Sequence, residues 1–196
     1  MKVVAILGTY RREGATAQAV EAILAGARAR GATTNTIYLL DHPIEFCRNC
    51  RNCTQFEGAK RGACPQHDSL ELILDDLEAA DSIILASPVN FFNVTALMRR
   101  FLERLVRYAY WPWGNMAPRD RIAEKSKKAV IVLSSAAPMI LTRLFTGAPK
   151  ALKTAASLLG AHTIDTLYLG LAAKSADIKL SQQSLARAHD IGTRLA

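Results

Sequence analysis

Short apolar runs that alternate with helical patterns constrain the fold of this chain most strongly. The first run, residues 3–7, is apolar without interruption and ends at Gly8, which is typical of a strand buried on both faces. Between the runs, apolar residues recur at helical spacing, as at Val20, Ile23 and Leu24. Five strands that alternate with helices predict an α/β fold with a parallel sheet covered on both faces. The remaining strands are expected over residues 34–40, 82–86, 129–133 and 163–169.

Length and composition favour one domain, residues 1–196. Half of the 196 residues are hydrophobic and 21% are charged, which suits a packed core and excludes a disordered chain. The one long polar stretch, residues 41–68, is expected to be an excursion, followed by a helix with Asp68 as its N-cap. No apolar run approaches the ~18 residues of a membrane span. Because the opening run is too short for a secretory signal, the expected location is the cytoplasm.

The functional site is expected at the carboxyl edge of the sheet. Ligands of such sheets bind beyond the carboxyl ends of the strands, which places loops 8–16, 87–93 and 134–138 together. In loop 8–16, backbone N–H groups at a helix N-terminus, two threonine hydroxyls and Arg11 suit a phosphate. The loop is neither G-x-G-x-x-G nor a Walker sequence, and an ordinary strand–helix turn is the alternative.

The other two loops offer less specific signals. Pro88 makes a stiff wall, and Phe91 and Phe92 suit either a flat ring or packing into the core. Backbone N–H groups of loop 134–138 can serve the carbonyl oxygens of a ring, but a plain turn explains this sequence equally well.

Two of these loops, taken together, resemble a known family. Loop 8–16 resembles the G-S-x-R-x-x-G-x-T phosphate loop of the flavodoxin-like NAD(P)H-dependent FMN reductases, with Thr9 in place of Ser. Residues 86–95 resemble their S-P-V-Y-[FW]-G-S loop, and residues 97–104 resemble the L-K-x-F-I-D-R helix. Asn90 departs from the usual Tyr, and Phe92 from the usual Gly. The resemblance implies a three-layer sandwich whose five-stranded parallel sheet has the order 2-1-3-4-5.

The resemblance also implies FMN that is bound without covalent attachment, and NAD(P)H as electron donor. The flavin would carry the chemistry, so no catalytic side chain is expected. Electrons would pass to a flavin, a quinone or another small-molecule or protein acceptor. The implied FMN-binding residues are Thr9, Arg11, Gly14, Ala15 and Thr16 for the phosphate, and Pro88, Val89, Asn90, Phe91, Phe92, Ser135, Ala136 and Ala137 for the ring.

All four cysteines lie in the polar excursion, spaced Cys47-x2-Cys50-x2-Cys53-x10-Cys64. C-x2-C-x2-C suits three corners of a [4Fe–4S] cluster with a fourth thiolate from elsewhere. The segment resembles the cysteine motif of the iron–sulfur flavoprotein branch of the same family. Zinc held by four thiolates, or thiols without metal, are the alternatives.

A net charge of +8 hints at an anionic ligand, and much of the excess lies between Arg99 and Lys128. A solvated helix face explains it, or a basic rim with Arg119 and Arg121 that attracts NADPH. No aromatic-interleaved basic run indicates nucleic-acid binding. Relatives form dimers or tetramers, so a homodimer or homotetramer is expected, with loop 110–113 as a candidate contact. The rival functions are an electron-carrying iron–sulfur flavoprotein and a cofactor-free binding module.

Overall fold

The computed structural model describes residues 1–58, 60–175 and 177–196, so Ala59, which lies in the predicted excursion, and Ala176 are outside the described residues. Five parallel strands form the central sheet in the order β2-β1-β3-β7-β8. The predicted order 2-1-3-4-5 is therefore confirmed. The strands are β1 (Lys2–Leu7), β2 (Thr33–Tyr38), β3 (Ser82–Asn90), β7 (Lys127–Ser134) and β8 (Ala161–Leu169).

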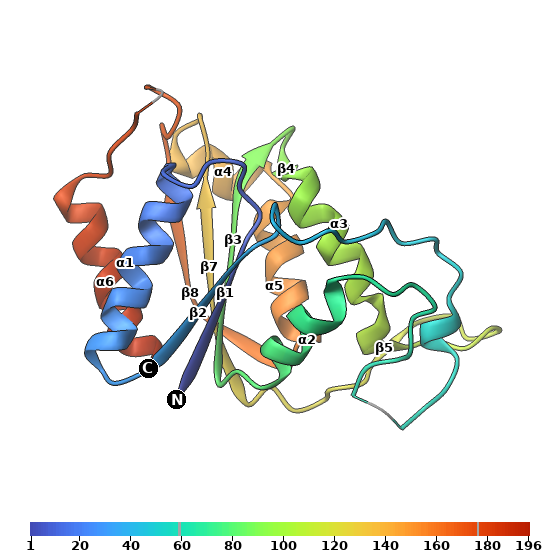
Figure 1. Cartoon of the computed structure of the whole chain (residues 1–196). Helices are drawn as coiled ribbons and strands as arrows, with labels where there is room; N and C mark the ends of the chain where they lie inside the picture. Colours follow the sequence, from blue (N-terminus) through green and yellow to red (C-terminus); the bar gives the residue numbers. More distant parts are fainter. Residues whose placement is uncertain (59, 176) are drawn as a thin grey trace.

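Helices cover both faces of the sheet and make three layers (Figure 1). Side chains of β1 alternate between two buried clusters, with Val3, Ala5 and Leu7 on one face and Val4 and Ile6 on the other. The continuous apolar run thus fills two cores at once, as a strand buried on both faces must. The first face is covered by α1 (Ala15–Ala29) and α6 (Gln182–Leu195), the second by α2 (Leu70–Glu78), α3 (Ala96–Arg104) and α5 (Ala148–Leu158).

Several short elements were not predicted from the sequence. Helix α4 (Met139–Phe145) buries only Thr142, so it has no apolar stripe to reveal it. Two-residue pairings carry no periodicity, which hides them from pattern analysis. They are the antiparallel strand β4 (Asn93–Val94) on β3, and the ribbon of β5 (Ala109–Tyr110) with β6 (Arg119–Asp120). The 3₁₀ turns are η1 (Asn52–Thr54) and η2 (Leu105–Tyr108).

Three expected boundaries are corrected by the structure. The third strand does not end at residue 86 but continues to Asn90, because it pairs with β7 as far as Pro88 and then with β4. The helical spacing of apolar residues from Val94 to Tyr108 predicts one continuous helix, but α3 ends at Arg104 and tightens into η2. Asp68 is not the N-cap of α2. That position is Ser69, and Asp68 instead accepts hydrogen bonds from the N–H groups of Glu45 and Leu70.

A buried threonine joins the first loop to α3. The Thr95 hydroxyl donates to the Gly8 carbonyl at 2.5 Å and accepts from the Met98 N–H at 3.3 Å, which caps α3. A Cβ on Gly8 would lie 2.6 Å from the Cβ of Met98, so this close approach requires glycine. The loop after β1 is therefore held directly against the helix that follows β3.

Candidate functional site

A pocket of about 220 Å³ opens at the carboxyl edge of the sheet. It is built from the carboxyl ends of β3 and β7 and from the loops that follow β1, β7 and β8, as the topology requires. Most of the predicted binding residues line it, namely Thr9, Arg11, Gly14, Ala15, Thr16, Pro88, Val89, Asn90, Ser135 and Ala136. The sequence analysis missed Ser134, Ala172 and Ala173, which also line it.

The N-terminus of α1 presents uncompensated positive charge to this pocket. The helix follows Gly14 without a side-chain cap and has no acidic residue in its first turn, although residues 15–17 are buried. The first N–H groups of a helix have no partner within the helix, and its dipole is positive at this end. Thr9 is buried beside them, and the Thr16 hydroxyl contacts the Ser134 hydroxyl at 2.7 Å. This arrangement suits a buried anion such as a phosphate.

The loops after β7 and β8 form another wall of the pocket and are hydrogen-bonded to each other. The Ser135 N–H donates to the Leu169 carbonyl at 2.9 Å, and the Ala172 N–H donates to the Ser135 carbonyl at 2.8 Å. Ala137 does not line the pocket, because its carbonyl accepts from the Ser135 hydroxyl and from the Leu171 N–H. The wall contributed by residues 172–173 was not predicted, because the motifs in the sequence lie after the first, third and fourth strands.

Phe91 and Phe92 lie at the tip of the hairpin between β3 and β4, outside the pocket lining. Their side chains are fully exposed and 72% exposed, and their φ angles of 47° and 60° are left-handed. Two consecutive left-handed residues make a turn that favours Asn and Gly, so two phenylalanines are strained here. Backbone strain of this kind persists where a site or an interface depends on it.

Exposed apolar side chains continue from this tip onto α4. The Phe92 carbonyl accepts a hydrogen bond from the Gly147 N–H at 2.9 Å, which ties the hairpin to the end of α4. We call the following residues the α4–hairpin surface: Phe91, Phe92, Met139, Ile140, Leu141, Leu144 and Phe145. Exposed apolar side chains that group in this way are typical of interaction surfaces.

The cysteine segment, which is the polar excursion over residues 41–68, packs beside α3 and β5 (Figure 1). Cys53 is buried, Cys50 is exposed, and all four thiols are free. Burial, followed by the charge of Cys64, raises the pKa of Cys53, and the charge of Arg107 opposes this shift. Within the described ranges, no three Cys, His, Asp or Glu side chains converge around a single metal ion.

Basic side chains connect the cysteine segment to the rest of the fold through ion pairs and hydrogen bonds. Arg61 forms ion pairs with Glu71, Asp75 and Glu78, and the Arg107 Nε donates to the Gly62 carbonyl. Arg51, which lies between Cys50 and Cys53 in the chain, makes a further contact by stacking on two tryptophan rings. Its guanidinium lies 4.1 Å from the ring centre of Trp111 and 4.0 Å from that of Trp113. The Nε atom of Arg51 is buried without a hydrogen-bond partner.

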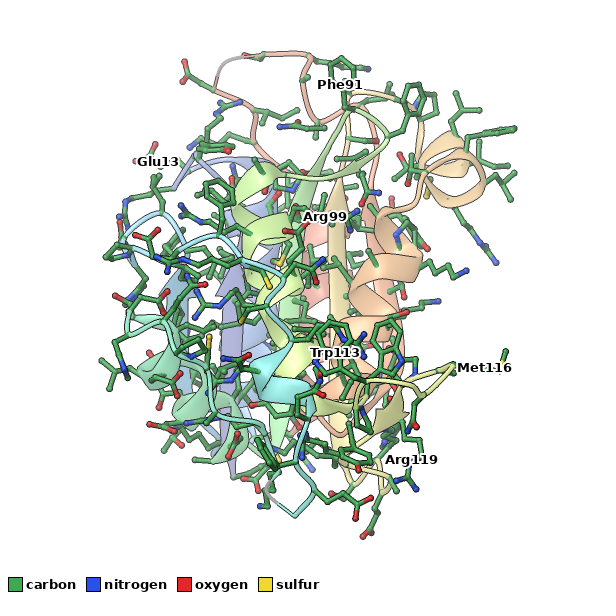
Figure 2. All side chains as sticks on the ribbon, turned by 90° about the vertical axis from the view of Figure 1, so that its right-hand side faces the viewer. Glu13, Phe91, Arg99, Trp113, Met116 and Arg119 are labelled. Carbon is green, nitrogen blue, oxygen red and sulfur yellow. The ribbon has the colours of Figure 1, made fainter. Side chains whose placement is uncertain are left out.

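The structure removes Arg119 and Arg121 from the rim of the pocket. Figure 2 shows Arg119 at the opposite end of the molecule from Phe91. Arg119 pairs with Glu57, and Arg121 donates to backbone carbonyls of the cysteine segment, including that of Phe56. The expectation that these two arginines form a basic rim beside the pocket is therefore wrong, because Arg119 lies in β6 and Arg121 directly follows it.

Comparisons of sequence and of structure find related proteins. The sequence model of the NADPH-dependent FMN reductases matches residues 1–175. An iron-sulfur flavoprotein of Archaeoglobus fulgidus is 32% identical over 112 residues, which are 57% of this chain and 49% of that protein. An iron-sulfur flavoprotein of Methanocaldococcus jannaschii is 36% identical over 104 residues, 53% of this chain and 51% of its own length. The chain thus spans about half the length of these curated relatives.

Solved structures share the fold at low sequence identity. An NAD(P)H:quinone oxidoreductase from Methanothermobacter marburgensis superposes with a TM-score of 0.75 at 18% identity, covering 100% of this chain and 99% of that one. An FMN-dependent NADH-azoreductase from Bacillus anthracis, solved in complex with FMN, gives a TM-score of 0.72 at 11% identity and the same coverage. Across the described part of the chain, the helices are too short or too polar to traverse a lipid bilayer.

Proposed function

Because the chain belongs to the NADPH-dependent FMN reductase family, we propose that it binds FMN in the pocket at the carboxyl edge of the sheet. The proposed activity is electron transfer from NAD(P)H through FMN to a flavin, a quinone or another acceptor. The observation that carries this proposal is the buried, uncapped N-terminus of α1. When bound, FMN would supply the chemistry by accepting hydride.

The residues of the pocket would bind and orient the cofactor. Thr9, Thr16 and the first N–H groups of α1 would hold the phosphate, with Arg11 at the open side. Pro88, in β3, and Ser135, directly after the neighbouring strand β7, would border the ring and exclude water from one of its sides. Since hydride transfer depends mainly on positioning, no side chain is assigned as acid or base.

A comparison of FMN with riboflavin tests the phosphate assignment. We expect the purified chain to bind FMN at least 10-fold more tightly than riboflavin, as measured by fluorescence quenching. Thr16→Val should weaken FMN binding and leave riboflavin binding nearly unchanged, because only FMN carries the phosphate. Arg30→Ala, at the exposed far end of α1, is the matched control. A colourless protein that takes up neither compound would contradict the proposal and support a cofactor-free binding module.

We propose further that Cys47, Cys50, Cys53 and Cys64 hold a [4Fe–4S] cluster, which would make the chain an electron carrier between FMN and a partner. The buried, unpaired Nε of Arg51 supports this, because an anionic cluster beside Cys50 and Cys53 would give that donor a partner.

Metal analysis tests this second proposal. Protein purified without oxygen should contain about four iron and four sulfide per chain, with broad absorption that acid bleaches. Cys64→Ser should lower the iron content, whereas Ser69→Ala, a nearby change that touches no thiol, should not. Zinc, or no metal in anaerobic protein, would contradict the cluster while leaving the FMN proposal standing.

The proposed assembly is a homodimer or homotetramer, and the proposed location is the cytoplasm. The α4–hairpin surface supports self-association, because a second copy would cover apolar side chains that this chain alone leaves in water. Light scattering after gel filtration should give at least twice the 21.4 kDa mass of the chain. Leu144→Lys should reduce the measured mass, and a monomer before mutation would contradict self-association.

A further inference from the structure

Helix α3 carries a fully buried charge next to the cysteine segment. The Arg104 side chain is 2% exposed, although arginine is rarely buried without a specific partner. Arg99, on the same helix, is 53% exposed and forms only an i,i+4 pair with Glu103. The burial of Arg104 therefore reflects its surroundings rather than the helix as a whole.

Three contacts fix the guanidinium of Arg104. Its Nη1 lies 2.6 Å from the Asp68 Oδ2 and donates to the Glu45 carbonyl at 2.8 Å. Its Nη2 faces the Cys64 Sγ at 3.6 Å, which is within the range of an N–H···S hydrogen bond. Burial opposes ionisation of Asp68, but N–H groups of Glu45 and Leu70 and the guanidinium outweigh it and hold the Asp68 pKa below its usual range. The ion pair thus keeps one donor aimed at the sulfur.

We propose that Arg104 is a positioning residue that holds Cys64 in place as the fourth cluster ligand and raises the reduction potential of the cluster. This inference rests on the proposed [4Fe–4S] cluster. A bound cluster would accept one electron from the reduced flavin, and no bond to Cys64 would break. Because the added electron would make the cluster more negative, a positive hydrogen-bond donor on a ligand sulfur would stabilise the reduced form.

Other arginines near the segment do not share this geometry. Arg107 is equally buried, but its hydrogen bonds go to the Gly62 carbonyl and to Glu71. Arg61 is held by three carboxylates. Among the described residues, Arg104 is the one with a recorded hydrogen bond to a cysteine sulfur. The structure therefore assigns the effect on Cys64 to one side chain.

The test is the midpoint potential of the cluster, measured by a redox titration followed by electron paramagnetic resonance. We expect Arg104→Gln to lower the potential and Arg104→Lys to restore part of the shift. Arg99→Gln removes the same charge from the exposed face of α3 and should leave the potential unchanged. Iron content, measured on every variant, reports whether Cys64 still binds.

A double variant separates the hydrogen bond from net charge and guards against misfolding. Arg104→Gln alone leaves the buried Asp68 carboxylate without its ion-pair partner. Arg104→Gln is therefore combined with Asp68→Asn, which keeps the net charge of the wild type. We expect the potential to stay low in the double variant. A return to the wild-type value, or equal shifts for the Arg99 and Arg104 variants, would overturn the inference. A wild-type protein without iron would instead overturn the proposed cluster, and this inference with it.

Discussion

Replacing Thr95 with Val removes one hydroxyl while keeping the shape of the side chain. That hydroxyl caps α3 through the Met98 N–H and donates to the buried Gly8 carbonyl. Loss of an N-cap costs about 1 kcal/mol. A buried carbonyl left without a donor costs a further ~1–3 kcal/mol. We therefore expect the free energy of unfolding to fall by roughly 2–4 kcal/mol, summed from these two effects.

Urea denaturation of FMN-free protein, followed by circular dichroism, measures this loss. Thr33→Val is the matched control, because the Thr33 hydroxyl is exposed and only donates to the Met1 carbonyl at 3.3 Å. The control should change stability by less than about 0.5 kcal/mol. The urea concentration at half-unfolding should fall without a change in the m-value, because unfolding exposes the same amount of surface.

The same substitution should weaken FMN binding. Gly8 begins the loop whose end is the α1 N-terminus, so losing its bond to Thr95 leaves the proposed phosphate site less rigid. A Thr95→Val protein that is as stable as the Thr33→Val control would refute the reasoning, because the Gly8 carbonyl would then have found another donor.

The remaining predictions concern the cysteine segment and the hairpin. Gly62→Ala should cost roughly 3 kcal/mol in thermal unfolding and expose Cys53 to alkylation, because the new Cβ would lie 1.7 Å from the Cys53 carbonyl oxygen. Unchanged alkylation would contradict that packing. Phe91→Asn with Phe92→Gly should raise the free energy of unfolding by about 1–2 kcal/mol, because both positions have left-handed φ angles. A loss of stability would show that the two rings contribute packing. Because the folded pKa of Asp68 is depressed, its contribution is present above the ordinary carboxylate pKa of about 3.9 and is lost as pH falls through the lower folded pKa. Asp68→Asn should therefore be less stable near pH 7 and lose less stability in acid, and parallel pH profiles would contradict this.

Parts of the site were predictable because they depend on local sequence and on general rules of topology. The apolar run over residues 3–7 and the helical stripe after it predicted a strand–loop–helix unit, which the structure contains. Loops 8–16 and 134–138 come together because parallel strands share one carboxyl edge. Ala172 was missed because a short apolar side chain carries no chemical signal of its own.

Other features depend on contacts between distant residues. Nothing in the spacing of Phe91 and Phe92 indicates a strained turn, because β4 is too short to show a pattern. A basic rim with Arg119 and Arg121 was one of two interpretations of the charge excess, whereas the β5–β6 ribbon carries Arg119 to the other end of the molecule. The sequence gives the number of charged residues, but only packing decides where on the surface they lie.

Sequence alone determined the order of strands and helices, the edge of the sheet where the pocket lies and the spacing of the cysteines, because each of these follows from local periodicity or chain order. Tertiary structure alone decided that Arg104 is buried and faces Cys64, while Arg99 on the same helix remains in solvent. The reason is physical: burial and hydrogen bonding join residues 40 positions apart, and no local pattern records such a contact.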